Sequence, residues 1–384
     1  MFGTLKFIPK NLPAVSLVFI GRELEMDRNP QDAAQSPRPK VGRFSQAVNL
    51  HYPLRENNIY KNPWETWQDH GLTTMMSFLK IAATEMHKTG VPRNIDELNK
   101  VLPVFRPDFE PNPDGRPKVT WIGHATVVLQ MDGITVLTDP IFSDRCSPVQ
   151  FVGNKRYRPP ACGIDALPAI DAVVISHNHY DHLDLGSVRQ LNARFGEKLR
   201  WYVPEGTAQW MRGNGCENVV EMNWWDENIL PGTDVTFAFT PSQHWCKRTA
   251  FDYCKQLWGS WCVISPKHRF FFGGDTGYCV GFKEIGDVYG PFDISAIPIG
   301  AYEPRWFMKF AHVNPEEAVK IHIDIKSRKS LGIHWGTFIL TTEYFMDPPE
   351  KLKEALEAAQ LSNNDFCTVC HGKAVSSDDP ANTS

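Results

Sequence analysis

The chain has 384 residues, of which 42% are hydrophobic, and this is enough apolar surface for one large α/β domain with extensions or for two conventional domains. Its 40 basic and 44 acidic side chains nearly balance, which argues against a protein whose main partner is a nucleic-acid backbone. Nine scattered cysteines indicate reduced thiols and a cytosolic face, and no apolar run reaches the roughly 18–20 residues that a membrane-spanning helix needs.

The two ends of the chain have the composition of segments outside a folded domain. Residues 22–49 are polar and contain prolines, and residues 374–384 are also polar. We expect a variable N-terminal extension over 1–49 that is largely disordered, one folded domain over 50–373, and a disordered tail over 374–384.

A stretch near residues 71–87 predicts an amphipathic helix. Its apolar side chains recur at i, i+3, i+4 and i+7 and form one stripe, made of Leu72, Met75, Met76, Leu79, Ala83 and Met86. Trp64 and Trp67 precede the stripe, where interfacial aromatic residues would stand. Such a stripe either packs against the body of the protein or faces a membrane, and the pattern alone leaves both interpretations open.

The rest of the chain alternates candidate strands with helical patterns. The first strands, within residues 119–140, contain Asp132-Gly133 as a hairpin turn. A helix is expected after Asn314, which caps it, with Pro315 in the first turn. A second helix is expected at 349–360, and further strands at 171–176, 199–204, 218–222, 235–241, 261–265, 269–274, 293–300, 330–334 and 366–371. This alternation predicts an α/β layered body with mixed sheets.

The stretch HNHYDH, residues 177–182, follows one of the apolar runs. His177 and His179 alternate past Asn178, so both side chains can face one point from an extended backbone. Asp181 and His182 follow where the chain is expected to turn. One tetrahedral ion rarely takes four ligands from six consecutive residues, so this spacing favours two metal ions.

Three more ligand-type residues stand just past the ends of apolar runs, at His244, Asp275 and His334. In α/β sheets the carboxyl edge of the strands is where sites are built, because rigid strands there meet free loops. Five imidazoles and two carboxylates make a nitrogen and oxygen site that suits Zn²⁺, with Mn²⁺ or Fe²⁺ as alternatives.

The HNHYDH motif resembles the HxHxDH signature of the metallo-β-lactamase superfamily. Longer strings, from Asn62 to Gly372, resemble the family of N-acylphosphatidylethanolamine-hydrolysing phospholipases D: WIGHAT, LTDPIFSDR, FTPSQHWCKR, FFFGGDTGYC, IPIGAYEPRWFMK and IHWGTF. The resemblance implies an α/β fold, the αβ/βα sandwich of two mixed sheets flanked by helices, with two zinc ions per chain.

The resemblance also divides the ligands. It implies that His177, His179 and His244 hold one zinc ion, that Asp181, His182 and His334 hold the other, and that Asp275 bridges them. Asp139 matches a position that orients a ligand histidine.

The same resemblance implies a reaction in which a hydroxide bridging the metal ions attacks the phosphorus of an N-acylphosphatidylethanolamine. The products are phosphatidic acid and an N-acylethanolamine, and Asp275 and Asp181 are the expected catalytic carboxylates.

Some side chains beside the ligands match substrate-contacting positions. These are Tyr180 and His312, for which packing and a hydrogen bond within the loop are the alternatives. Lys247 and Arg248 follow His244 closely and either meet lipid phosphate or form an ordinary surface pair. The stretch NKRYR, residues 154–158, adds positive charge that would attract anionic lipid.

A membrane phospholipid substrate implies peripheral association, which we expect at the cytosolic face of intracellular membranes, and the family pattern allows a homodimer. The alternative enzyme is a soluble lactonase of the same fold, which shares the WIGHAT-like start. A nuclease fits the charge poorly. A lipid-binding protein without turnover fits poorly with a full set of seven ligands.

Overall fold

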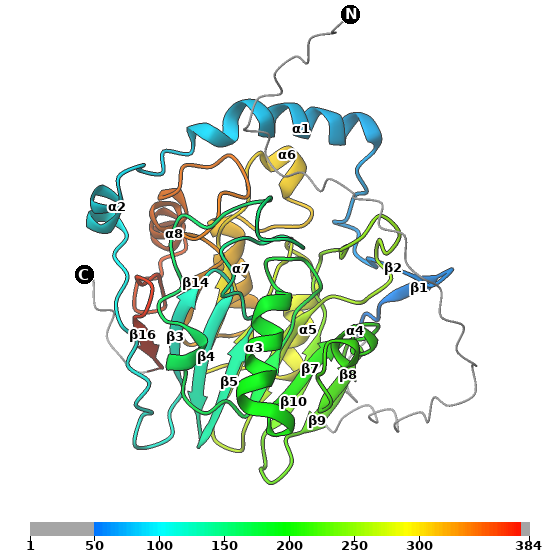
Figure 1. The fold of residues 1–384 in the computed structure, drawn as a ribbon, viewed down its shortest axis with the longest axis vertical. Coiled ribbons are helices and arrows are strands. Elements are labelled where there is room, and N and C mark those ends of the chain that lie inside the picture. The colour runs from blue at the N-terminus through cyan, green and yellow to red at the C-terminus, as the bar shows by residue number, and fades with distance from the viewer. Residues whose placement is uncertain (1–49, 378–384) are drawn as a thin grey trace, which may run out of the picture.

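Two seven-stranded mixed sheets form the centre of the molecule (Figure 1). The computed structural model describes residues 50–377, so the predicted N-terminal extension and residues 378–384 lie outside it. The first sheet has the strand order β16-β3-β4-β5-β6-β7-β8. Its strands are β3 (Lys118–Gly123), β4 (Thr126–Met131), β5 (Ile134–Thr138), β6 (Ala172–Val174), β7 (Arg200–Pro204), β8 (Val219–Met222) and β16 (Ala374–Ser376).

The second sheet has the order β15-β14-β13-β12-β11-β10-β9. Its strands are β9 (Glu227–Ile229), β10 (Thr236–Thr240), β11 (Ser260–Ile264), β12 (Arg269–Phe272), β13 (Ile294–Pro298), β14 (Ser330–Ile333) and β15 (Phe366–Cys367). Each sheet is antiparallel over its earlier strands and parallel over the later ones, with β16 returning antiparallel to β3. A separate two-stranded hairpin pairs β1 (Leu54–Glu56) with β2 (Ile59–Lys61).

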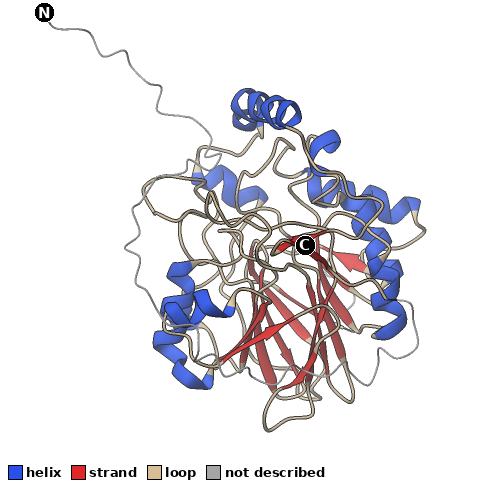
Figure 2. Ribbon diagram, turned by 90° about the vertical axis from the view of Figure 1, so that its right-hand side faces the viewer, coloured by secondary structure: helices blue, strands red, loops and turns tan. Residues whose placement is uncertain are grey.

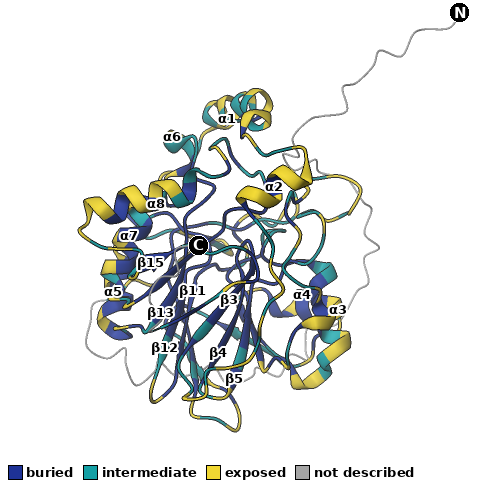
Figure 3. Cartoon of the chain, turned by 90° about the vertical axis from the view of Figure 1, so that its left-hand side faces the viewer, coloured by how far each residue is buried: buried dark blue, intermediate teal, exposed yellow. Residues whose placement is uncertain are grey.

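Helices cover both outer faces of this sandwich (Figure 2). On the side of the first sheet lie α3 (Leu185–Phe195) and α4 (Ala208–Gly213), and on the side of the second lie α5 (Gly281–Val288), α7 (Pro315–Asp324) and α8 (Asp347–Ala358) (Figure 3). The remaining α-helices are α1 (Leu72–Glu85), α2 (Ile95–Val101) and α6 (Arg305–Met308), and the 3-10 turns are Met86–Lys88, Ile164–Ala166 and Gly196–Lys198. The predicted αβ/βα sandwich is therefore confirmed.

Local signals in the sequence form the expected structures. The Asp132-Gly133 turn joins β4 to β5 with φ of 48° and 83°, the left-handed geometry that a two-residue hairpin turn needs. The Asn314 side chain accepts the Glu317 N–H and caps α7 in a reciprocal capping box. Apolar runs such as the one in β12 are buried because one face meets the other sheet and the other face meets helices.

The disordered tail predicted from residue 374 is wrong at its start. Ala374–Ser376 form the edge strand β16, in which Val375 pairs with Val119 of β3 and is 5% exposed. Burial of this one apolar side chain and the ladder hydrogen bonds outweigh the polar composition of the segment.

Two predicted membrane-facing features are also wrong. Trp64 is buried, its indole N–H donates to the Ser242 carbonyl at 3.1 Å, and its ring stacks on Trp224, so it belongs to the core. In NKRYR, Arg156 and Arg158 are buried, and Arg156 donates to backbone carbonyls such as that of Ile141 at 2.8 Å. These two guanidinium groups therefore bind the protein itself and do not form a positive surface.

The predicted amphipathic helix is present as α1, which lies across the top of the molecule near α6 (Figure 1). The Phe307 ring of α6 stacks on His70 at 4.0 Å and on Phe78 at 4.2 Å, which fastens α1 to the body. The predicted stripe is not the packed face, since Leu72 is 78% exposed and Met76 is 62% exposed. Among residues 50–377, no helix combines the length and the hydropathy that crossing a bilayer requires.

Candidate metal centre

All seven predicted ligands meet at one edge of the sandwich. Each follows the carboxyl end of a strand: residues 177–182 follow β6, His244 follows β10, Asp275 follows β12 and His334 directly follows β14. Gly274 allows the close approach of β12 to β6, because a Cβ there would lie 2.5 Å from the Ser176 Cβ. The edge predicted from the strand ends is therefore where these side chains converge.

Three imidazoles form the first cluster. His177 Nε2 lies 2.8 Å from His179 Nδ1, and His244 Nε2 lies 3.3 Å from the same atom. Zinc bonds of about 2.0–2.1 Å in a tetrahedron place neighbouring ligand atoms roughly 3.3 Å apart, so these nitrogens are spaced to surround one ion.

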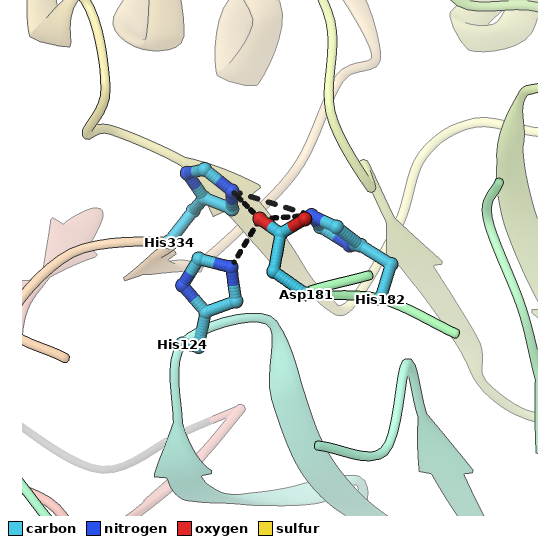
Figure 4. A group of neighbouring side chains, drawn as sticks. All are labelled: His124, Asp181, His182 and His334. Carbon is cyan, nitrogen blue, oxygen red and sulfur yellow. Dashed lines mark hydrogen bonds and ion pairs between the residues drawn. The ribbon is translucent and has the colours of Figure 1, made fainter. Parts of the chain in front are cut away.

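A second cluster lies beside it (Figure 4). His182 Nε2 and His334 Nε2 are 3.3 Å apart, and Asp181 Oδ2 lies 3.3 Å from the first and 3.7 Å from the second. Two imidazoles and one carboxylate oxygen again face a common point.

Asp275 stands between the two clusters. Its Oδ2 is 3.8 Å from both His177 Nε2 and His244 Nε2 in the first cluster, and 3.1 Å from His182 Nε2 in the second. Its Oδ1 is 3.0 Å from His334 Nε2. A carboxylate in this position can serve both clusters at once.

The far side of several imidazoles is also fixed. Asp139 Oδ2 accepts a hydrogen bond from His182 Nδ1 at 2.6 Å. This is a contact that can orient a ligand histidine, the role predicted for Asp139. His244 Nδ1 faces the Ala311 carbonyl at 2.9 Å. Such partners set the ring orientation and leave the opposite nitrogen to point into the cluster.

The charges of the site favour an added cation. Burial disfavours ionised Asp275, yet the positive charges of His182 and His334 hold its pKa well below the usual range. Burial also disfavours protonated His334, but the Asp275 charge and donation of a hydrogen bond to the Asp181 carboxylate raise the pKa of His334 to about 9. In contrast, burial lowers the pKa of His179 to about 3. The ionised Asp275 carboxylate is therefore stable in this buried site only beside positive charge, which either protonated imidazoles or divalent ions can provide.

His312 lies inside the centre, as its predicted role requires. Its Nδ1 is 4.0 Å from Asp275 Oδ2, is buried, and has no hydrogen-bond partner among the described residues. Burial drives its pKa well below the usual range, so its imidazole is neutral at physiological pH.

Tyr180 and Arg248 hold one another in place. The Tyr180 hydroxyl donates to the Arg248 carbonyl at 2.9 Å, and the Arg248 guanidinium lies 4.1 Å from the Tyr180 ring centroid. The same guanidinium donates to the carbonyls of Asn178 and Leu183. These contacts favour the packing alternative for Tyr180. Arg248 stabilises the loop that carries the ligands, because it donates to backbone carbonyls of that loop. Lys247 is half-buried.

One histidine of this centre, His124, is not among the predicted site residues. His124, in the turn between β3 and β4, lies 3.0 Å from Asp181 Oδ2 through its Nε2. Its signal in the sequence is a polar residue at the end of an apolar strand, as for His334, inside the WIGHAT string.

A family model described as "Beta-lactamase superfamily domain" matches residues 135–335. The chain is 40% identical over 334 residues to N-acyl-phosphatidylethanolamine-hydrolyzing phospholipase D 1 of Caenorhabditis elegans, covering 84% of this chain and 93% of the relative. It is 31% identical over 353 residues to the mitochondrial N-acyl-phosphatidylethanolamine-hydrolyzing phospholipase D of Saccharomyces cerevisiae, covering 82% and 75%.

Solved structures support the fold alone. An isothiocyanate hydrolase from Delia radicum gut bacteria superposes with a TM-score of 0.53 at 18% identity, covering 67% of this chain and 98% of that one. The metallo hydrolase Igni18 of Ignicoccus hospitalis superposes with a TM-score of 0.51 at 19% identity, covering 67% and 97%.

Proposed function

Since the chain belongs to the N-acyl-phosphatidylethanolamine-hydrolyzing phospholipase D family, within the β-lactamase superfamily, we propose that it hydrolyses N-acylphosphatidylethanolamines to N-acylethanolamines and phosphatidic acid. Membership of this family and the fold make the protein a metal-dependent hydrolase. The position of Asp275 between the two clusters is the observation that supports a two-metal hydrolase, and the two relatives support the lipid substrate.

The ligand assignment follows the geometry. His177, His179 and His244 would hold one zinc ion, Asp181, His182 and His334 the second, and Asp275 both. When bound, two divalent ions supply a water of lowered pKa and neutralise charge on the phosphoryl oxygens. The donor set fits such ions because its nitrogens are spaced for zinc and the Asp275 carboxylate is buried.

Side chains of this chain prepare the reaction around the ions. Asp139 fixes His182, and Arg248 fixes the loop that carries the HNHYDH ligands. The imidazole of His312 can donate to a phosphoryl oxygen of the substrate, because it is neutral and its Nδ1 is otherwise unpaired among the described residues. We assign substrate contact to His312, whereas the Tyr180 ring packs against the Arg248 guanidinium and helps to hold the loop that carries the ligands.

The surface of α1 supports action at a membrane. A diacyl phospholipid with a third acyl chain stays in its bilayer, so the enzyme must come to it. The exposed stripe of Leu72, Met75 and Met76 can bury its apolar area in that bilayer, and Trp306 of the neighbouring α6 is also exposed. Peripheral binding, the cytosolic face of intracellular membranes and a homodimer remain predictions of the family resemblance.

One purified sample tests the proposal against the lactonase alternative. We expect close to two zinc ions per chain by elemental analysis, and release of N-acylethanolamine from phosphatidylcholine vesicles that contain N-acylphosphatidylethanolamine. Opening of simple lactones without hydrolysis of the vesicle lipid would reject the phosphodiesterase proposal. Binding of the lipid without turnover by zinc-loaded protein would favour a lipid-binding protein.

A further inference from the structure

His124 connects the two sheets at the metal centre through its backbone. Its N–H donates to the Thr337 hydroxyl at 2.9 Å, and its carbonyl accepts the His334 N–H at 3.0 Å. The carbonyl also accepts the Trp121 indole N–H at 2.9 Å. His124 therefore joins the end of β3 to the loop after β14, which carries a candidate ligand from the other sheet.

The imidazole of His124 reaches a second candidate ligand. Its Nε2 is 3.0 Å from Asp181 Oδ2, and its ring is 4.1 Å from the His334 ring (Figure 4). The Phe338 ring meets it edge-on at 5.2 Å, and His124 is 1% exposed, so it has little freedom to turn. Within the described residues, the other histidines with a ring nitrogen within 4.0 Å of this carboxylate are His182 and His334, which are themselves candidate ligands.

We propose that His124 is a positioning residue of the metal centre: its Nε2–H donates to Asp181 Oδ2 and fixes the rotation of that carboxylate toward the second zinc site. This inference rests on the metal centre of the proposed function. A ligand role is the alternative, but Asp181, His182, His334 and Asp275 already offer four donors. A fifth would leave no open position for water or substrate.

The consequence is specific to one of the two sites. Loss of a partner that orients a ligand costs roughly 10–100-fold in metal affinity. We expect this loss at the site of Asp181, His182 and His334, while the site of His177, His179 and His244 keeps its affinity.

A matched pair of variants isolates the donated hydrogen bond. His124→Gln and His124→Met are both unbranched and similar in length, both must adopt the left-handed φ of 54°, and both keep the backbone bonds. Only glutamine offers an N–H toward Asp181. The readouts are zinc content after dialysis, zinc affinity by chelator competition, and thermal unfolding of the chelated proteins.

We expect the methionine variant to lose about 10–100-fold in affinity at one site and to retain close to one zinc ion per chain. The glutamine variant should recover most of that loss, with the same unfolding temperature as the methionine variant after chelation. Equal, wild-type affinity in both variants, with two ions in the wild type, would overturn the inference and leave the metal centre intact.

Three other results also overturn it. Equal loss in both variants would mean that His124 acts through packing. A crystal structure of the zinc-loaded wild-type protein that places His124 Nε2 about 2.0–2.1 Å from zinc would make His124 a ligand. A wild-type protein without stoichiometric zinc would reject the metal centre itself, and the inference with it.

Discussion

The exposed face of α1 gives the sharpest test of action at a membrane. We take the double substitution Leu72→Glu with Met76→Glu, because these side chains are 78% and 62% exposed and lie one helical turn apart. Full burial of such a side chain stabilises by about 1.5–3 kcal/mol. Scaled by the exposed fractions of the two side chains, their burial in a bilayer would contribute roughly 2–4 kcal/mol to membrane binding. Loss of this contribution should weaken vesicle binding roughly 30- to 1,000-fold.

The chain offers a matched control in Thr73→Glu with Ser77→Glu. These positions have the same spacing on the same helix and are also exposed, but they are polar, so they gain the same charge without losing apolar area. Sedimentation with phosphatidylcholine vesicles, which carry no net charge, measures binding for both variants. Hydrolysis of a short-chain, monomeric substrate shows whether the metal centre is intact.

The reasoning predicts that both variants fold and cleave the short-chain substrate, and that the Leu72 and Met76 variant alone loses vesicle binding and vesicle hydrolysis. Wild-type vesicle binding by that variant would refute the membrane role of α1. Loss of its thermal stability, with the control unaffected, would instead mean that the stripe is buried in the functional protein. As a positive control for that outcome, Ala82→Glu places a carboxylate at the buried face of α1 and should unfold the region.

Four further tests follow from the site and the fold. Asp275→Asn should bind fewer than two zinc ions by elemental analysis, because Asp275 is proposed to serve both sites. Its activity should fall by more than the roughly 10–100-fold expected when a residue that only orients a ligand is lost. Hydrolysis in ¹⁸O-water should label phosphatidic acid in the mass spectrum, because water attacks phosphorus; label in the N-acylethanolamine would mean attack at carbon. Gly274→Ala should lose about 1–3 kcal/mol of unfolding free energy in urea, because its Cβ would clash with Ser176, whereas Gly133→Ala, which also has positive φ but nothing within 4 Å, should lose less. Burial lowers the pKa of His322 from 6.5 to about 4, so between these pH values the unfolded chain binds more protons than the folded protein. The free energy of unfolding should therefore fall by at most roughly 3 kcal/mol as the pH drops through this window. His322→Gln should flatten the slope of unfolding free energy against pH, and an unchanged slope would contradict this explanation.

Much of the candidate metal centre could be predicted because its signals are local. HNHYDH is contiguous, and the separate ligands stand at strand ends that apolar runs announce. The Asp132-Gly133 turn and the Asn314 cap were likewise predictable, since each depends on backbone geometry over a few residues. Such patterns reveal elements and the edge of the sheet where they end.

The three-dimensional packing decided the rest. Trp64 and the exposed stripe of α1 are both apolar in the sequence, yet the tryptophan lies in the core and the stripe faces solvent. Arg156 has the charge of a surface residue but satisfies backbone carbonyls inside the protein. In each case the chemistry of the side chain is readable from the sequence, whereas its partner is not.

His124 shows the physical reason most clearly. From the sequence alone, a histidine stands at the end of an apolar strand, and this position suits a core residue or a functional one. Its contacts with Asp181 and with the His334 backbone arise only where the two sheets pack face to face and bring β3 and β14 together. Strand periodicity specifies which residues share a face of one sheet, but no local pattern encodes which residues of another sheet that face will meet, because strands buried on both sides read as uniformly apolar.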